Sequence, residues 1–264
     1  MPAILDNKHP DVPSVFRASA LLREARRQKA LPEAVVPSIC VLDPDGDIVR
    51  HLRSAGRASR CASWPCYHTE LDTFTVAGER VGIIGCAVGA PFAVLVAEEL
   101  FASGCRLLLS LTSAGQIAPI RPPPYFVIMD RALRDEGTSY HYAAPADYAE
   151  ADPSCVSLAQ GAVSEAGLDV AVGATWTTDA PFRETAGAIA AAKARGLLAV
   201  EMEAAALYAF ARASGSAVLC LAYVTNTMGQ ALHDFEKGAR DGTQEALALI
   251  AAIVPCAARR FCKV

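Results

Sequence analysis

The feature that most limits the fold of this chain is a regular alternation between short apolar runs and longer alanine-rich runs. Runs such as "SICVLD" (38–43) and "ERVGIIG" (79–85) have the length and the β-branched content of buried strands. Between them stand runs such as "APFAVLVAEELFASG" (90–104), which have the length of helices. This alternation predicts an α/β fold in which helices cover both faces of a central mixed sheet. We therefore expect a single three-layer domain over residues 1–264.

The composition limits the kind of ligand. Hydrophobic residues make up 53% of the 264 residues, charged residues make up 20%, and the formal net charge is −4. Nucleic acid or an anionic membrane surface would require a basic stripe, which the sequence lacks, so neither is an expected partner. A small-molecule ligand fits better. The nine cysteines include no CxxC pair, which indicates buried thiols in a reducing compartment and predicts no metal site.

The first 37 residues precede the alternating pattern. Within them, "SALLREARRQKAL" (19–31) has the apolar spacing of an amphipathic helix with a basic outer face, so we expect a helical extension over residues 1–37. The N-terminal residues have neither a basic start nor the apolar run of a signal peptide, and no run reaches membrane-spanning length. These features predict a cytoplasmic protein.

Two carboxylates interrupt the apolar run "GLLAVEMEAAALYAF" (196–210). Glu201 and Glu203 cannot share a helix face, because successive helical residues turn by about 100°. A strand that ends near Val200 and a helix that begins near Glu203 fit better, and Glu203 would then face a cleft. There it could accept two hydroxyl protons from a sugar diol while Met202 packs on an apolar ring. The alternative is a capping glutamate beside a core methionine.

Three other expected strand ends carry small or polar residues. Gly89, in "GCAVGAPFA", would let an anion approach the start of a helix, although such glycines also serve close packing alone. Thr112 and Ser113, in "SLTSAGQIAP", offer hydroxyl and amide groups that suit phosphate, or form an ordinary polar turn. Asn226, in "YVTNTMG", can donate and accept at the edge of a heterocycle, or cap a turn.

Together these segments resemble the nucleoside phosphorylase family, which includes uridine phosphorylase and the bacterial purine nucleoside phosphorylases. "AVEMEAAALYAFA" resembles the family signature, and "VGIIGCAVGAPFA", "RALRDEGTSYHY", "TWTTDAPFRET" and "VTNTMG" resemble further segments in the same order. The resemblance covers residues 38 to 254 and is closest to the uridine phosphorylase-like branch. It implies cleavage of a nucleoside by inorganic phosphate, without a cofactor, to give free base and ribose 1-phosphate. It also implies a homo-oligomer built from dimers, with a hexamer as one form.

The resemblance also implies roles for individual residues. Glu203 would bind the ribose hydroxyls with support from Glu201, and these two with Asn226 form the expected catalytic group. The further ribose-binding residues would be Met202, Thr138 and His68, the last acting across a subunit boundary. The expected phosphate-binding residues are Gly89, Thr112, Ser113, Arg131 and Arg134. The expected base-binding residues are Phe182, Arg183, Gly115 and Asn226.

The sequence departs from the family pattern where phosphate should bind. Ser110 stands where the family usually has an arginine, and the early phosphate loop is represented only by "LDPDGDI" (42–48), which brings three aspartates. Loss of an arginine should weaken phosphate binding, so Arg131, Arg134 or Arg53 would have to replace it. The alternatives are a nucleosidase that uses water, with Glu201 or a loop aspartate as base, and a non-catalytic nucleoside-binding protein.

The segments on the base side restrict the choice of base without settling it. Asn226 stands where an aspartate protonates 6-aminopurines in the hexameric purine enzymes, which argues against such a substrate. "TTDAPFRET" and "RDEGTSYHY" favour a uridine-like base. An asparagine can also bind the edge of a 6-oxopurine.

Overall fold

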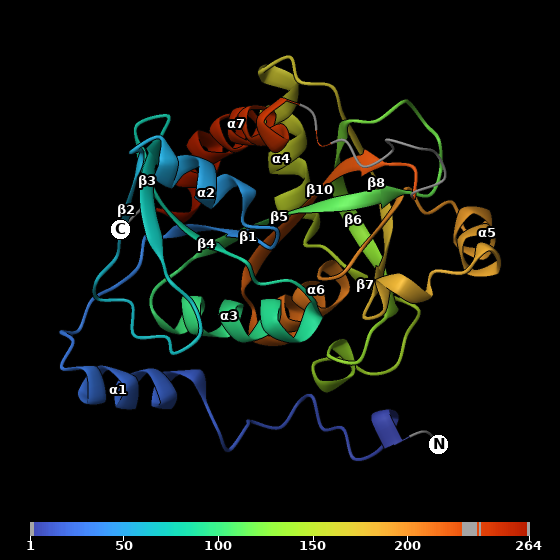
Figure 1. The fold of residues 1–264 in the computed structure, drawn as a ribbon. Helices are drawn as coiled ribbons and strands as arrows, with labels where there is room; N and C mark the ends of the chain where they lie inside the picture. The colour runs from blue at the N-terminus through green and yellow to red at the C-terminus, as the bar shows by residue number, and fades with distance from the viewer. Residues whose placement is uncertain (1–2, 229–236, 238, 263–264) are drawn as a thin grey trace.

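The structure of the protein is a computed structural model that describes residues 3–228, 237 and 239–262. Ten strands of this part form one mixed sheet, flanked by helices on both faces (Figure 1). The strands are β1 (Ile39–Asp43), β2 (Ala58–Arg60), β3 (Asp72–Val76), β4 (Glu79–Gly85), β5 (Leu107–Gln116), β6 (Tyr125–Asp135), β7 (Tyr148–Glu150), β8 (Val170–Thr178), β9 (Ala199–Glu201) and β10 (Ala217–Asn226). The predicted α/β fold with a central mixed sheet is confirmed.

The strand order places β5 at the centre of the sheet. β5 runs parallel to β1 on one side and to β10 on the other, and its first six residues are buried. The remaining neighbours follow the order β10-β6-β8-β9-β5-β1-β4-β3-β2, and because β10 pairs with both β6 and β5, five of the strands close into a ring. The ends of β5, β9 and β10 therefore meet at one place.

The described residues include seven α-helices, five of which form two layers. The seven are α1 (Ala18–Lys29), α2 (Asp47–Ser54), α3 (Ala90–Ala102), α4 (Pro153–Glu165), α5 (Ala186–Ala194), α6 (Ala204–Ser214) and α7 (Thr243–Phe261). α2, α4 and α7 cover one face, while α3 and α6 pack together on the other (Figure 1). No helix in the described ranges has the length and apolar character needed to cross a bilayer.

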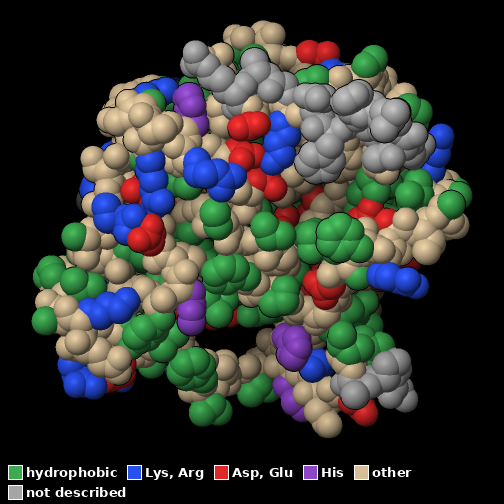
Figure 2. Space-filling view, in the orientation of Figure 1, with side chains coloured by type: hydrophobic (Ala, Val, Ile, Leu, Met, Phe, Trp, Pro, Cys, Tyr) green, Lys and Arg blue, Asp and Glu red, His purple; other side chains and the backbone are tan. Residues whose placement is uncertain are grey.

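The N-terminal segment lies outside these layers. Leu22 and Ala25 of α1 are buried where α1 packs on α3, and Lys29 donates hydrogen bonds to the carbonyl oxygens of Pro65 and Cys66. Figure 2 shows an open gap between this segment and the main body. The side chains of Val15 and Phe16, on the connection that leads into α1, are 103% and 71% exposed. The segment is thus attached through α1 and leaves apolar side chains uncovered.

Candidate active site at the ends of β5, β9 and β10

The junction between β9 and α6 is organised by the Glu201 carboxylate. Its Oε1 accepts hydrogen bonds from the hydroxyls of Thr175 and Thr177, and its Oε2 accepts from the amides of Glu203 and Ala204. β9 ends at Glu201 and α6 begins at Ala204, within one residue of the bounds expected from sequence. With four donors on its two oxygens, Glu201 joins β8, β9 and α6 and has little capacity left to act as a base.

Glu203, the residue just before α6, is 1% exposed and only half satisfied. Its Oε1 accepts a hydrogen bond of 2.7 Å from the amide of Gly89, whereas its Oε2 is buried without a hydrogen-bond partner. A buried carboxylate oxygen without a donor is costly, and at this strand-to-helix junction it is an acceptor that a ligand group could satisfy. Glu201 therefore stabilises the junction between β9 and α6, whereas Glu203 has one oxygen available to a ligand.

Burial raises the pKa of Glu203 to about 8, and the nearby Glu201 charge adds to this effect, while the Gly89 amide and the Thr112 hydroxyl lower it in part. Burial also raises the pKa of Glu201, but its four donors favour the ionised form. We therefore assign the negative charge at neutral pH to Glu201 and the proton to Glu203.

Gly89 is the turn residue before α3 and has a φ of 92°, a conformation that glycine adopts without strain. The turn directs its amide to Glu203 rather than to open solvent. The residue predicted to bind phosphate is thus brought to the residue predicted to bind ribose, but its N–H group is already engaged.

The donors of Ser113, in β5, are also already bound to a carboxylate of the chain. The Ser113 amide donates to Asp45 Oδ2 at 2.9 Å and its hydroxyl to Asp45 Oδ1 at 3.1 Å. The neighbouring Thr112 is buried, and its hydroxyl donates to the Ser113 carbonyl oxygen. The Asp45 side chain comes from the loop between β1 and α2, where the resemblance implies a phosphate loop. A carboxylate of the chain therefore occupies the two donors expected to bind phosphate.

Asn226 and Gly115 lie side by side, because they are paired residues of β10 and β5. Asn226 Oδ1 accepts from the amide of Met228, and its Nδ2 donates to the Thr225 hydroxyl. A Cβ on Gly115 would lie 2.0 Å from Met228 Sδ, so the glycine is required for this close approach. The structure thus brings together two of the residues predicted to bind the base.

Two loops border the same end of the sheet and are tied to each other. The Glu136 carboxylate accepts from the amide of Thr138, and the amide of Gly137 donates to Asp179 Oδ2 at 2.9 Å. Phe182 and Arg183 follow Asp179 in the short helix η3 (Pro181–Arg183), and both side chains are exposed. Thr138, Phe182 and Arg183 thus belong to loops that are held together, although their side chains make no contact with Glu203 that the structure describes.

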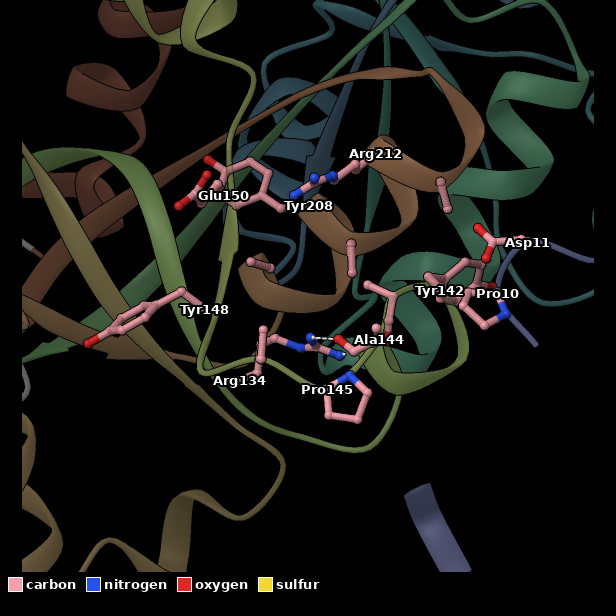
Figure 3. Close-up of a pocket in the computed structure, with 15 residues that line it drawn as sticks. Pro10, Asp11, Arg134, Tyr142, Ala144, Pro145, Tyr148, Glu150, Tyr208 and Arg212 are labelled. Atoms are coloured by element: carbon pink, nitrogen blue, oxygen red, sulfur yellow. Dashed lines mark hydrogen bonds between the residues drawn. The ribbon is translucent and has the colours of Figure 1, made fainter. Parts of the chain in front are cut away.

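The two arginines expected near phosphate are engaged elsewhere. The guanidinium of Arg131 lies 5.0 Å from the ring centroid of Tyr148. Arg134 is buried and donates to Ser139 Oγ and to the carbonyl oxygens of Ala143 and Ala144. Arg134 lines a pocket of about 630 Å³. Figure 3 shows it there together with Tyr208 and Arg212. This pocket does not include Glu203, Ser113 or Asn226.

The remaining candidates are also away from Ser113. Arg53 pairs with Asp72 and Glu70. His68 is exposed in the loop before β3 and lies near Glu99, whose pKa is raised by burial and lowered only in part by neighbours that include His68. Glu99 lies ten residues after Gly89 in α3, which corresponds to about 15 Å along the helix. Within one chain, His68 is therefore near the far end of α3.

The profile of the phosphorylase superfamily matches residues 38–255 of this chain. The chain belongs to the phosphorylase superfamily. Residues 38–255 hold every strand of the sheet, and the segment before them includes α1. The family resemblance inferred from the sequence motifs is confirmed.

Several curated members of the superfamily are similar over part of the chain. A DeoD-type purine nucleoside phosphorylase of Shewanella denitrificans is 28% identical over 161 residues, which are 58% of this chain and 66% of the relative. A guanosine phosphorylase of Halorubrum lacusprofundi is 28% identical over 138 residues, which are 52% of this chain and 57% of the relative. The matched regions thus span less than two thirds of these relatives.

Solved structures of the superfamily share the fold over a larger part of the chain. A uridine phosphorylase of Vibrio fischeri, crystallised with 6-hydroxy-1-naphthoic acid, superposes with a TM-score of 0.71 at 20% identity. The superposition covers 86% of this chain and 93% of that structure. The fold is therefore shared almost completely, although the sequences have diverged.

The motifs did not identify two cations near Asp45. Lys237 Nζ lies 2.5 Å from Asp47 Oδ2 and 3.7 Å from Asp45 Oδ2, and Arg50 donates to the Asp45 carbonyl oxygen. Figure 2 shows acidic and basic side chains gathered next to one another on this face. Lys237 follows Asp47 by 190 residues, so no local pattern connects them. Arg50 could have been identified from the sequence, because it stands just after the expected phosphate loop at 42–48.

Proposed function

We propose that this member of the superfamily cleaves the N-glycosidic bond of a nucleoside and releases the free base. The observation that carries the proposal is the Oε2 atom of Glu203, which is buried without a donor at the meeting point of β9, α3 and α6. A ribose hydroxyl would supply the missing hydrogen bond. As positive charge develops on the sugar, its attraction to the Glu203 carboxylate increases. Glu203 would then bind the transition state more strongly than the substrate, which is what accelerates the reaction.

The surrounding residues support distinct parts of this reaction. Glu201 orients the Glu203 backbone through its hydrogen bond to that amide, and the half-buried Met202 is available to pack on the sugar. Asn226 and Gly115 are proposed to bind the base, with Phe182 and Arg183 on the loop that covers it. The amide of Asn226 suits a uridine-like base or a 6-oxopurine, each of which offers both a donor and an acceptor.

Either phosphate or water could accept the sugar in this reaction. Phosphate is supported by the phosphorylases similar to this chain, and Lys237 and Arg50 are the cations near the loop where it would bind. Water is supported by the occupation of both Ser113 donors by Asp45. The first reaction gives ribose 1-phosphate and the second gives ribose.

A panel of pyrimidine and purine nucleosides, assayed with and without inorganic phosphate, tests the proposal. We expect free base from at least one uridine-like or 6-oxopurine nucleoside. The identity of the sugar product then separates phosphorolysis from hydrolysis. Tight nucleoside binding without release of base from any member of the panel would reject the enzyme and support a binding protein.

A further inference from the structure

The amide and the hydroxyl of Ser113 form a pair of donors that we call the Ser113 cradle. Both donors bind the same carboxylate, through two separate oxygens of Asp45, with donor–acceptor distances of 2.9 and 3.1 Å. Proteins also bind phosphate with pairs of donors that are directed at two oxygens of one anion. Asp45 therefore satisfies the cradle with a negative group that belongs to the chain.

The charges around the cradle do not favour a second anion. Asp43 ends β1 and Asp47 begins α2, on either side of the loop that carries Asp45, and both line a small cavity with Asp45 and Ser113. Lys237 is the cation of this cavity within the described residues, and it already pairs with Asp45 and Asp47. Position 110, two residues before Thr112 on β5, carries a buried serine and no charge. An incoming phosphate would have to displace one carboxylate and remain beside others.

We propose that Asp45 selects the sugar acceptor by keeping phosphate out of the Ser113 cradle, so that water takes its place. This inference rests on the proposed cleavage of a nucleoside. In the overall reaction the oxygen of water forms a bond to C1′ of the sugar as the bond to the base nitrogen breaks. The electron pair of that bond leaves with the base, and the two protons of water end on the new sugar hydroxyl and on the base.

Substitutions can separate two effects of Asp45 on phosphate binding: its negative charge and its occupation of the Ser113 cradle. Asp45→Ala removes the carboxylate and frees both donors of Ser113, whereas Asp47→Ala removes an equal charge two residues later, at the start of α2, and leaves the cradle occupied. Asp45→Asn keeps the side-chain volume but removes the charge and one of the two acceptor oxygens, so it is the second variant if the alanine variant does not fold. The double variant Asp45→Ala with Ser113→Ala removes both the occupant and the hydroxyl donor.

Calorimetric titration with inorganic phosphate, without nucleoside, is the direct test. We expect Asp45→Ala to bind phosphate at least ~10-fold more tightly than the wild type, because charge-assisted donors become available. Asp47→Ala should gain less than about threefold, and the double variant should lose most of the gain. Equal phosphate affinity of wild type and Asp45→Ala, or an equal gain in Asp47→Ala, would overturn the proposal.

The sugar product gives a second measurement in any nucleoside assay. The wild type should yield ribose at a rate that does not depend on phosphate, and Asp45→Ala should yield some ribose 1-phosphate. Ribose 1-phosphate as the main product of the wild type would also overturn the proposal. If no nucleoside is cleaved, the proposed function fails, but the titration still decides whether Asp45 excludes phosphate.

Discussion

At the scale of single residues, the site depends on two glutamates that stand two positions apart and have opposite tasks. The sequence shows both carboxylates and the strand-to-helix junction, but it does not show which oxygens are satisfied. Glu201 accepts four hydrogen bonds, two of them from threonines of β8, more than twenty residues earlier in the chain. The distinction between the holding and the binding carboxylate comes from these long-range contacts.

The raised pKa of Glu203 predicts how activity depends on pH. Because burial raises this pKa to about 8, the free protein carries a proton on Glu203 at neutral pH. The ionised form should be the one that stabilises the developing positive charge on the sugar. We expect kcat/KM for the nucleoside to rise with pH, about tenfold per unit below pH 8, and to level off above it.

Initial rates at low nucleoside concentration between about pH 6 and pH 9.5 measure this profile, and Glu203→Gln should abolish the rise in whatever activity remains. A profile that is flat over this range, or one that falls toward high pH, would show that the ionised Glu203 is not the active form.

At the scale of elements, Glu201 connects β8, β9 and α6, so its main effect should be on stability. Glu201→Ala leaves two threonine hydroxyls and two amides at the start of α6 without their acceptor. We expect the free energy of unfolding to fall by about 3 kcal/mol or more, since the lost bonds are to a buried charged group. Denaturant unfolding followed by circular dichroism measures the change.

Thr185→Ala is a suitable control, because it removes the exposed side-chain cap of α5, in which Thr185 Oγ1 accepts from the amide of Ala188. Its cost should be on the order of 1 kcal/mol. If Glu201→Ala unfolds at the same denaturant concentration as the wild type, Glu201 does not hold the junction.

The elements themselves follow closely from the sequence, because local signals are strong where strands are apolar and helices are rich in alanine. β1 and β4 lie where the apolar runs 38–43 and 79–85 predicted them. The contacts of charged side chains in loops do not follow in this way. The pairing of Asp45 with Ser113 joins residues 68 positions apart, and the engagement of Arg134 depends on the fold of residues 139–144.

At the scale of the whole molecule, the exposed apolar side chains of the N-terminal segment predict association. Val12, Val15 and Phe16 are 65%, 103% and 71% exposed, and a gap separates this segment from the main body (Figure 2). Burial of such side chains between chains would stabilise a homo-oligomer. We expect a dimer or a larger assembly of dimers in light scattering at micromolar concentration, and His68 could then reach a neighbouring site.

Substitution of Val15 and Phe16 by serine should shift this assembly toward smaller species, whereas substitution of Val172, an exposed apolar residue of β8, should not. A wild type that is strictly monomeric and fully active would contradict the expected assembly.

The central claim is that the unpartnered oxygen of Glu203 binds the sugar, and a comparison of two buried glutamates tests it most directly. Glu203 and Glu99 are each 1% exposed and have carboxylate oxygens without partners, but Glu99 lies ten residues after Gly89 in α3. For the best nucleoside of the panel, kcat/KM should fall at least ~100-fold in Glu203→Gln, or roughly 2.7 kcal/mol, and less than about threefold in Glu99→Gln. Equal activity of Glu203→Gln and the wild type, with both variants folded, would remove Glu203 from the site and contradict the account.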